Sequence, residues 1–481
     1  MIKKNFKNLA VCAVTMIPFA LLVIFTVILL SGCGKTDIDT TEKITETLQE
    51  ESKAENDSVI HKPAVESGEI EILMAVSDGY IYDCIDEYTK TYPGIKITDR
   101  EIEKRDGLEW NILAEEIKDG NGPDIIIVNR RQLTVLKDAG VVLPLDSYIY
   151  DDVKESIFEG AYEFGAYGDD HYALPYNANI FAYKTNEKFI EEHSVTLNEL
   201  MDAFEKEQSR KSEKMRVEAI YYSADASQLL WDLCVRNIDD SEFVDFENGK
   251  CSFDSEDFCR FLRFCKENAD PSSDMYLSDD ERIEQVRSGK AFMIGVAGGL
   301  RGYSTMSSKL GDDFISVMPS EKGKEAGIEV YWGAAISSES KNKEIAIDFV
   351  NSLISECNQL KYTGDYVRRD VIADNIREDI EIDEYRRAAL GLEEGACDVG
   401  LWLGDGYVPL DTRSDGTSYA DEYITLMDNA VPISSNTEIQ DIIMEEAGAF
   451  FAGSKDEYEV AKVIQSRVQL YFDEYESVYN D

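Results

Sequence analysis

The sequence predicts an α/β protein in which parallel strands alternate with helices. Two stretches of the chain, residues 69–128 and 196–318, switch repeatedly between the period of a strand and the period of a helix. The chain has 481 residues, of which 43% are hydrophobic and 10% aromatic, enough for two or three domains that each bury a core. Alternating strands and helices at this spacing favour a parallel sheet with crossover helices.

The first α/β set begins at residue 69. Glu69 to Ser77 alternates polar and apolar residues and predicts a strand, and Tyr80 to Tyr92 has helical spacing until Pro93-Gly94 stops it. A strand at 96–103, a helix at 110–117 and a buried strand at 124–128 are expected next. Asp124 is expected to hold the end of its strand.

A long extended run follows and then a second α/β set. Tyr172 to Lys184 contains Pro175, which lacks an amide hydrogen, so we expect a crossing segment at a sheet edge rather than a central strand. The later elements expected are helices at 196–208, 226–236 and 255–268, strands at 291–296 and 314–318, and an amphipathic helix pair within 434–475.

The N-terminus reads as a membrane-insertion signal. Three lysines at positions 3, 4 and 7 precede an uncharged apolar run, Leu9 to Leu30, that ends in Leu30-Ser31-Gly32-Cys33. This end resembles the lipobox of bacterial lipoproteins, which implies a signal peptide at 1–32 and a lipid on Cys33. An uncleaved anchor is the alternative, because 22 apolar residues can span a bilayer. Both readings put the body on the extracytoplasmic face of the membrane.

Residues 33–66 form a predicted disordered tether, since they are mostly Thr, Glu, Ser, Asp and Lys and bury little apolar surface. The full chain has 48 Lys+Arg and 96 Asp+Glu, a formal charge of -48. Loss of the three lysines would give 45 minus 96, or -51. A surface this acidic excludes nucleic acid as a partner and disfavours anionic ligands.

The sequence gives little support for a metal site or for covalent catalysis. There are three histidines, and no G-x-S-x-G, P-loop or H-E-x-x-H motif occurs. Asp411, Asp415, Gly416 and Glu422 match positions of a calcium loop, but Arg413 stands where an oxygen ligand is needed, so no metal and no cofactor are predicted. Seven cysteines lie beyond Cys33, in an odd number that argues against a disulfide framework; they are Cys84, Cys234, Cys251, Cys259, Cys265, Cys357 and Cys397. Buried thiols are expected, and a bridge between Cys251 and Cys259 stays open.

Several short motifs, in order, resemble one family. Gly120 to Asp124 followed by Ile125 to Ile127 is similar to the GxGPD-plus-strand element of the extracellular solute-binding proteins that serve ABC importers, of the sugar (maltodextrin-binding-like) type. Further matching stretches are Leu143 to Asp146 with Tyr148-Ile149, Tyr172 to Asn177, Tyr183 to Asn186, Ser288 to Met293, and Ala335 to Val350. Residues 357–433 depart from the family pattern.

The resemblance implies a periplasmic-binding-protein-like fold. Two α/β lobes, 67–178 plus about 334–365 and 179–333 plus about 366–481, would be joined by crossing strands and would clamp a ligand by hinge closure. It also implies delivery of the ligand to a membrane permease, and we expect a monomer.

Position by position, the resemblance puts ligand contacts in three loops. The polar set is Ser77, Asp78, Asn129, Arg131, Tyr176, Asn177 and Asn179. Ordinary turns or surface polarity are the alternatives for these residues; Arg368 and Arg369, which could also reach a ligand, are expected in surface ion pairs.

Aromatic faces suit a sugar ring, and the four tryptophans differ as candidates. Trp332 lies where a return crossing strand is implied and is the main stacking candidate. Trp231 either faces the cleft or packs in the second lobe, Trp110 is expected in the core, and Trp402 is left open.

The leading hypothesis is a solute-binding lipoprotein that captures a small hydroxyl-rich ligand, an oligosaccharide, for an ABC permease. The alternatives are a ligand-sensing subunit for a membrane receptor and a carbohydrate-active enzyme, but no catalytic residue is predicted.

Overall fold

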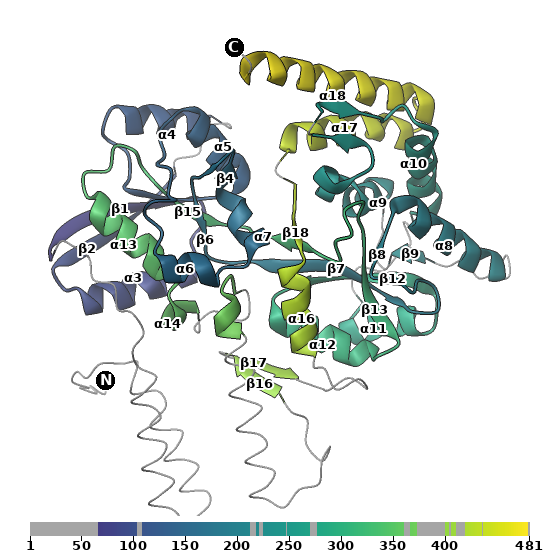
Figure 1. Ribbon diagram of the computed structural model, residues 1–481, viewed down its shortest axis with the longest axis horizontal. Helices are drawn as coiled ribbons and strands as arrows, with labels where there is room; N and C mark the ends of the chain where they lie inside the picture. Colours follow the sequence, from purple (N-terminus) through teal and green to yellow (C-terminus); the bar gives the residue numbers. More distant parts are fainter. Residues whose placement is uncertain are drawn as a thin grey trace, which may run out of the picture. The chain divides into compact units, whose positions relative to one another are not determined.

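A computed structural model describes most of the chain beyond residue 65 (Figure 1). The described residues are 66–102, 108–211, 218–220, 225–246, 248–269, 277–359, 366–372, 400–403, 406–409, 419–434 and 436–479. They belong to one compact unit, Ala64–Asp481. The predicted signal peptide, Cys33 and nearly all of the predicted tether lie outside the described residues. None of the helices in the described ranges is both long and apolar enough to cross a membrane.

The first sheet has five strands in the order β2-β1-β3-β15-β6. Its strands are β1 (Gly68–Met74), β2 (Ile95–Glu101), β3 (Ile125–Val128), β6 (Leu174–Pro175) and β15 (Gly333–Ile336). β1 pairs in parallel with β2 and β3, as predicted, whereas β15 returns antiparallel to β3. All four residues of β3 are buried, because helices cover both faces of this sheet.

The first two helices packed on this sheet confirm the predictions at 80–92 and 110–117, and no range was predicted for the others. The helices on this sheet are α3 (Gly79–Thr91), α4 (Glu109–Lys118), α5 (Arg130–Asp138) and α13 (Lys343–Leu353). Gly122 permits the tight turn between α4 and β3, since a Cβ there would lie 2.3 Å from a side-chain carbon of Ile117. The Asp124 carboxylate accepts from the Glu71 amide at 2.9 Å and the Ser340 hydroxyl at 2.6 Å. It therefore ties three segments together at the strand end, which confirms the structural role expected for it.

Short elements connect the first sheet to the crossing segment. They are α6 (Asp151–Ser156), α7 (Glu159–Tyr162), η2 (Glu163–Gly165), β4 (Ala166–Tyr167), β5 (Asp170–His171) and, later in the chain, α14 (Glu356–Gln359).

The extended run from Tyr172 to Lys184 divides between the two sheets. Pro175 lies in β6, at the edge of the first sheet, as expected from its missing donor. The expectation was wrong for the second half of the run: β7 (Asn179–Asn186) is a central strand of the second sheet, with seven buried residues. Pro175 precedes β7 in the chain, so every residue of β7 keeps the backbone N–H group that it needs for pairing in the sheet.

The second sheet has seven strands, with β18-β14-β7-β12-β9 as its main order and β13 and β8 joined through β7. Its strands are β8 (Ser194–Val195), β9 (Glu218–Ile220), β12 (Ala291–Gly298), β13 (Phe314–Pro319), β14 (Gly327–Glu329) and β18 (Val431–Pro432), with β7. β7 is antiparallel to β12, β13 and β14. We call this sheet with its helices the second lobe, and the five-stranded sheet with its helices the first lobe.

The second-lobe helices include those predicted at 196–208, 226–236 and 255–268 and the pair predicted within 434–475; the others were not predicted. The helices of this lobe are α8 (Leu197–Arg210), α9 (Ala226–Leu233), η3 (Val235–Asp240), α10 (Glu256–Asn268), α11 (Asp279–Arg287), α12 (Leu300–Leu310), α16 (Tyr419–Asp428), α17 (Thr437–Phe451) and α18 (Glu457–Tyr479). Two hairpins complete the fold, β10 (Val244–Asp245) with β11 (Lys250–Cys251) and β16 (Gly400–Leu403) with β17 (Gly406–Pro409).

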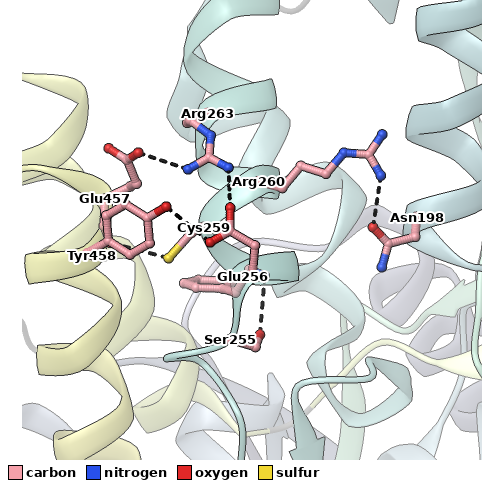
Figure 2. A network of polar contacts seen from close by, with 9 residues as sticks. Asn198, Ser255, Glu256, Cys259, Arg260, Arg263, Glu457 and Tyr458 are labelled. Atoms are coloured by element: carbon pink, nitrogen blue, oxygen red, sulfur yellow. Dashed lines mark hydrogen bonds and ion pairs between the residues drawn. The ribbon is translucent and has the colours of Figure 1, made fainter.

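The C-terminal helix pair is fastened to α10. Arg263 lies between Glu256 and Glu457, at 2.7 and 2.9 Å, and Tyr458 donates to Glu256 at 3.0 Å (Figure 2). These bonds raise the pKa of Arg263. Apolar residues of α17 and α18 share a buried core with α9 and α10, so the pair is part of the second lobe.

Five cysteines whose side chains are described are free thiols. Cys84, Cys234, Cys259 and Cys265 are buried and Cys251 is half-buried. The bridge between Cys251 and Cys259 that the sequence left open is therefore not formed. Burial raises the pKa of the Cys251 thiol to about 11.

A buried ion pair joins β7 to α16. The Lys184 side chain has no exposed surface, and its ammonium lies 2.8 Å from a Glu422 oxygen and 5.1 Å from the centre of the Tyr303 ring. Glu422 also accepts from Ser316 at 3.3 Å. The calcium-like pattern thus has its last carboxylate bound to a lysine, and its other members, Asp411, Asp415 and Gly416, lie outside the described residues.

Candidate functional site

A pocket of about 270 Å³ lies beyond the carboxyl ends of β1 and β3. Its walls come from the loop after β1, from β3 itself, and from the two segments that cross between the sheets. The lining residues are Val76, Ser77, Asp78, Gly79, Ile127, Tyr176, Asn177, Tyr331 and Trp332. Ligands of α/β sheets bind at this end of the strands, so the pocket is the candidate binding site.

Asp78 has a fixed orientation in this pocket. It caps α3, accepting from the Tyr80 amide at 2.9 Å, while its other oxygen accepts from the Tyr176 hydroxyl at 2.9 Å. Tyr176 is fully buried and its ring stacks on Tyr80, with centroids 5.7 Å apart. The carboxylate is thus held in place by the helix start and the first crossing segment.

The two crossing segments meet at Asn177 and Trp332. The Asn177 amide oxygen accepts from the Trp332 backbone at 3.4 Å, and Trp332 is half-buried between β14 and β15. The chain therefore returns from the second sheet to the first at Trp332, as expected, but Trp332 lies between two strands rather than in one. Beside it Tyr331 is 44% exposed and donates to Glu329 at 3.1 Å. Burial and the Glu329 charge raise the pKa of Tyr331.

Asn179 opens β7 next to this group. It pairs with Glu329 across the sheet and is only 6% exposed. Its amide oxygen is buried without a hydrogen-bond partner among the described residues. A buried unpaired acceptor costs roughly 1 to 3 kcal/mol.

Asn129 and Arg131 do not line the pocket. Asn129 forms the capping box of α5 with Gln132. Arg131 is exposed and pairs with Asp441 of α17 at 2.7 Å. Each of these polar groups already has a protein partner, unlike the amide oxygen of Asn179.

The other tryptophans whose side chains are described do not line the pocket as Trp332 does. Trp231 is half-buried against the second-lobe core and lies outside the pocket lining. Trp110 packs against the first-lobe core, which confirms its expected role. Trp402 falls in β16, where only the backbone is described.

The two arginines of the divergent stretch have protein partners. Arg368 is 6% exposed and makes bonds of 2.9 and 2.6 Å to Asp370, and Arg369 binds Asp428 at 2.9 Å. The expected ion pairs are confirmed, although Arg368 is buried rather than on the surface. Arg386 and Arg387 lie outside the described residues.

Sequence reasoning missed four pocket residues, Val76, Gly79, Ile127 and Tyr331. Tyr331 could have been found, because it adjoins Trp332 and an aromatic pair at a crossing strand offers two ring faces. Val76, in the loop after β1, is 63% exposed. It adds apolar surface to the pocket rim.

A group of carboxylates in the second lobe has raised pKa values. We call them the second-lobe carboxylates: Asp232, Asp239, Asp240, Glu242 and Glu321. Burial is the largest cause that raises the pKa of each. Within the described residues no group of three or more His, Cys, Asp or Glu is arranged to hold a metal ion.

The pocket chemistry is that of a binding site. It combines the flat faces of Tyr331 and Trp332 with acceptors and donors at Ser77, Asp78 and Asn177. One fixed carboxylate and aromatic rings suit a neutral, hydroxyl-bearing ligand.

Comparison with known proteins agrees with this geometry. A family model described as bacterial extracellular solute-binding protein matches residues 75–360, more than half of the chain. A maltotriose-binding protein of Pyrococcus abyssi is 33% identical over 129 residues, which is 27% of this chain and only 28% of that relative.

Solved structures match the fold. A cyclic alpha-maltosyl-1,6-maltose binding protein from Arthrobacter globiformis matches with a TM-score of 0.53 and 14% identity, over 84% of this chain and 99% of that one. A family 1 extracellular solute-binding protein from Alicyclobacillus acidocaldarius matches with a TM-score of 0.52 and 15% identity, over 86% and 99%. The periplasmic-binding-protein-like fold is thus confirmed, and the family match confirms a binding protein rather than an enzyme. The chain belongs to the family of bacterial extracellular solute-binding proteins.

Proposed function

We propose that this protein captures a neutral oligosaccharide and delivers it to an ABC permease. The observation that carries the proposal is the pocket, in which Trp332 and Tyr331 offer stacking faces next to the fixed carboxylate of Asp78. The regional similarity to a maltotriose-binding protein supports a maltodextrin as the ligand. In this proposal a ligand hydroxyl donates to Asp78, whereas Asn179 lies outside the pocket lining and its amide oxygen is enclosed by protein.

Capture is proposed to proceed by closure of the two lobes, with boundaries at 67–178 plus about 334–365 and 179–333 plus about 366–481. The crossing segments act as hinges, and contacts completed only in the closed cleft shift the population toward it. Trp231, Asn129 and Arg131 lie outside the pocket lining in this structure, so the proposed ligand contacts do not include them.

The protein is further proposed to be a lipoprotein, monomeric and tethered to the extracytoplasmic face of the membrane through Cys33. The apolar run ending in Leu30-Ser31-Gly32-Cys33 supports this. Mass spectrometry of the membrane-extracted protein should show a chain that starts at Cys33 and carries lipid. An unmodified chain that begins at Met1 would instead establish the uncleaved anchor.

The binding experiment uses the full-length protein in mild detergent with malto-oligosaccharides, other sugars, amino acids and polyamines. A ligand at about 100 times its Kd should stabilise the fold by roughly 2.7 kcal/mol in thermal unfolding. Trp332→Ala should abolish the shift, whereas Trp110→Phe, in the first-lobe core, should keep it. No shift with any sugar would reject the proposed ligand, and consumption of the sugar would favour an enzyme.

A further inference from the structure

The first turn of α5 is where opposite charges of the two lobes meet. Arg131 binds Asp441 at 2.7 Å, and the two are 310 positions apart in the sequence. Leu133 and Leu136 anchor α5 in the first-lobe core, and Ile439 and Ile443 anchor α17 in the second-lobe core. The ion pair therefore connects helices of two different core clusters, while a third core, which contains Ile72 and Ile328, spans both lobes.

A second arginine, Arg130, lies next to this pair in the sequence. Arg130, the neighbour of Arg131, donates to the carbonyls of Phe164 and Ala166 and lies 3.8 Å from the centre of the Tyr167 ring. These contacts keep it in the first lobe. Burial lowers the pKa of Arg130, while Tyr167 and then Asp239 of η3 act in the opposite direction, so Asp239 is close enough for its charge to be felt.

Asp239 is itself held by the second lobe. It accepts from Ser434 and from Asn436, each at 2.7 Å, in the segment that leads from β18 into α17. Arg131 thus pairs with a second-lobe aspartate, and the charge of another second-lobe aspartate, Asp239, acts on Arg130.

We propose that Arg131 and Asp441 form an electrostatic latch that favours the closed arrangement of the lobes. This inference rests on the proposed closure mechanism. Hinge opening separates α5 from α17 and breaks the pair, whereas closure forms it, so the pair adds its free energy only to the closed arrangement. Arg131 is then a positioning residue, which acts on the ligand through closure and not through contact.

The size of the effect follows from exposure. The two side chains are 63% and 70% exposed, so solvent and salt screen the attraction, and an exposed pair is a weak one. Apparent affinity scales with the closed population, so we expect Arg131→Gln and Asp441→Asn each to raise the Kd by about two- to five-fold. Salt at about 0.5 M should raise the Kd of the natural protein toward that of the variants.

The test measures lobe separation first, without ligand. Labels on unnatural amino acids at Lys118 of α4 and Glu205 of α8, both on exposed surfaces, report the distance between lobes in the full-length protein in detergent. Arg131→Gln and Asp441→Asn should lengthen it equally, and the charge swap Arg131→Asp with Asp441→Arg should restore it. Arg467→Gln is the matched control, because Arg467 binds Glu446 of α17 within the second lobe. Unchanged distances in both variants would overturn the latch.

Titration with maltotriose then separates the latch from a ligand contact. Equal loss of affinity in Arg131→Gln and Asp441→Asn, with rescue by the swap, supports the latch. Loss in Arg131→Gln alone, without rescue, overturns it and makes Arg131 a direct contact. If the natural protein binds no sugar, the proposed ligand fails while the distance measurement still decides the latch.

Discussion

Lys184 tests how β7, the strand that follows the first crossing segment, is held in the second lobe. Substitution by Met keeps the length and apolar character of the side chain but removes the charge opposite Glu422. Lys184 is 0% and Glu422 13% exposed, so little water reaches the carboxylate that remains. Breaking a buried pair from one side costs about 3 to 5 kcal/mol, because an uncompensated charge stays in the core. The serine hydroxyl at 3.3 Å offsets only part of that cost.

The assay is urea unfolding of Lys184→Met followed by fluorescence, with thermal unfolding as a second measure. At about 2 °C per kcal/mol for a large domain, Tm should fall by roughly 6 to 10 °C. Lys309→Met is the control: Lys309 lies 2.7 Å from Asp280, but the two are 45% and 79% exposed, so its loss should change stability by less than about 1 kcal/mol. The double variant Lys184→Met with Glu422→Leu should regain most of the loss. Equal effects of Lys184→Met and Lys309→Met would refute the reasoning that burial sets the magnitude.

Three further outcomes are expected. Unfolding at pH 5.5 should need more urea than at pH 7.5, because the second-lobe carboxylates have raised pKa values in the folded state. The folded state then binds more protons than the unfolded state as the pH falls toward about 4, so the free energy of unfolding rises over that window. A lower urea midpoint at pH 5.5 would contradict this. Tyr176→Phe removes the hydroxyl that binds Asp78 and should cost about 1 to 2 kcal/mol in urea unfolding and weaken sugar binding, whereas Tyr82→Phe, which loses an exposed bond to Asp99, should do neither. Cys251 should react with a thiol reagent far more slowly at pH 7.5 than a free cysteine does, since its pKa is about 11; rapid reaction of the folded protein would argue against that environment.

Local patterns in the sequence were sufficient to predict many of the strands and helices and much of their order. The buried run of β3 predicted a strand covered on both faces, and the helix that begins after Asp78 has the capping residue that the pattern required. Pro175 was placed correctly at an edge because a missing donor acts at the residue itself. The central position of β7 was missed, since nothing within Asn179–Asn186 tells how many strands will pair beside it.

The sequence by itself therefore determined the α/β class, the order of strands and helices, and loops that contribute Asp78, Asn177 and Trp332 to the pocket. Only the tertiary structure decided that Trp231 lies outside the pocket lining, that Arg131 pairs with Asp441, and that Lys184 pairs with Glu422. Periodicity and capping depend on neighbours a few residues away, whereas these partners are 310 and 238 residues apart. With 96 carboxylates available to 48 cations, charge alone could not select them, and the packing of helices on two sheets did.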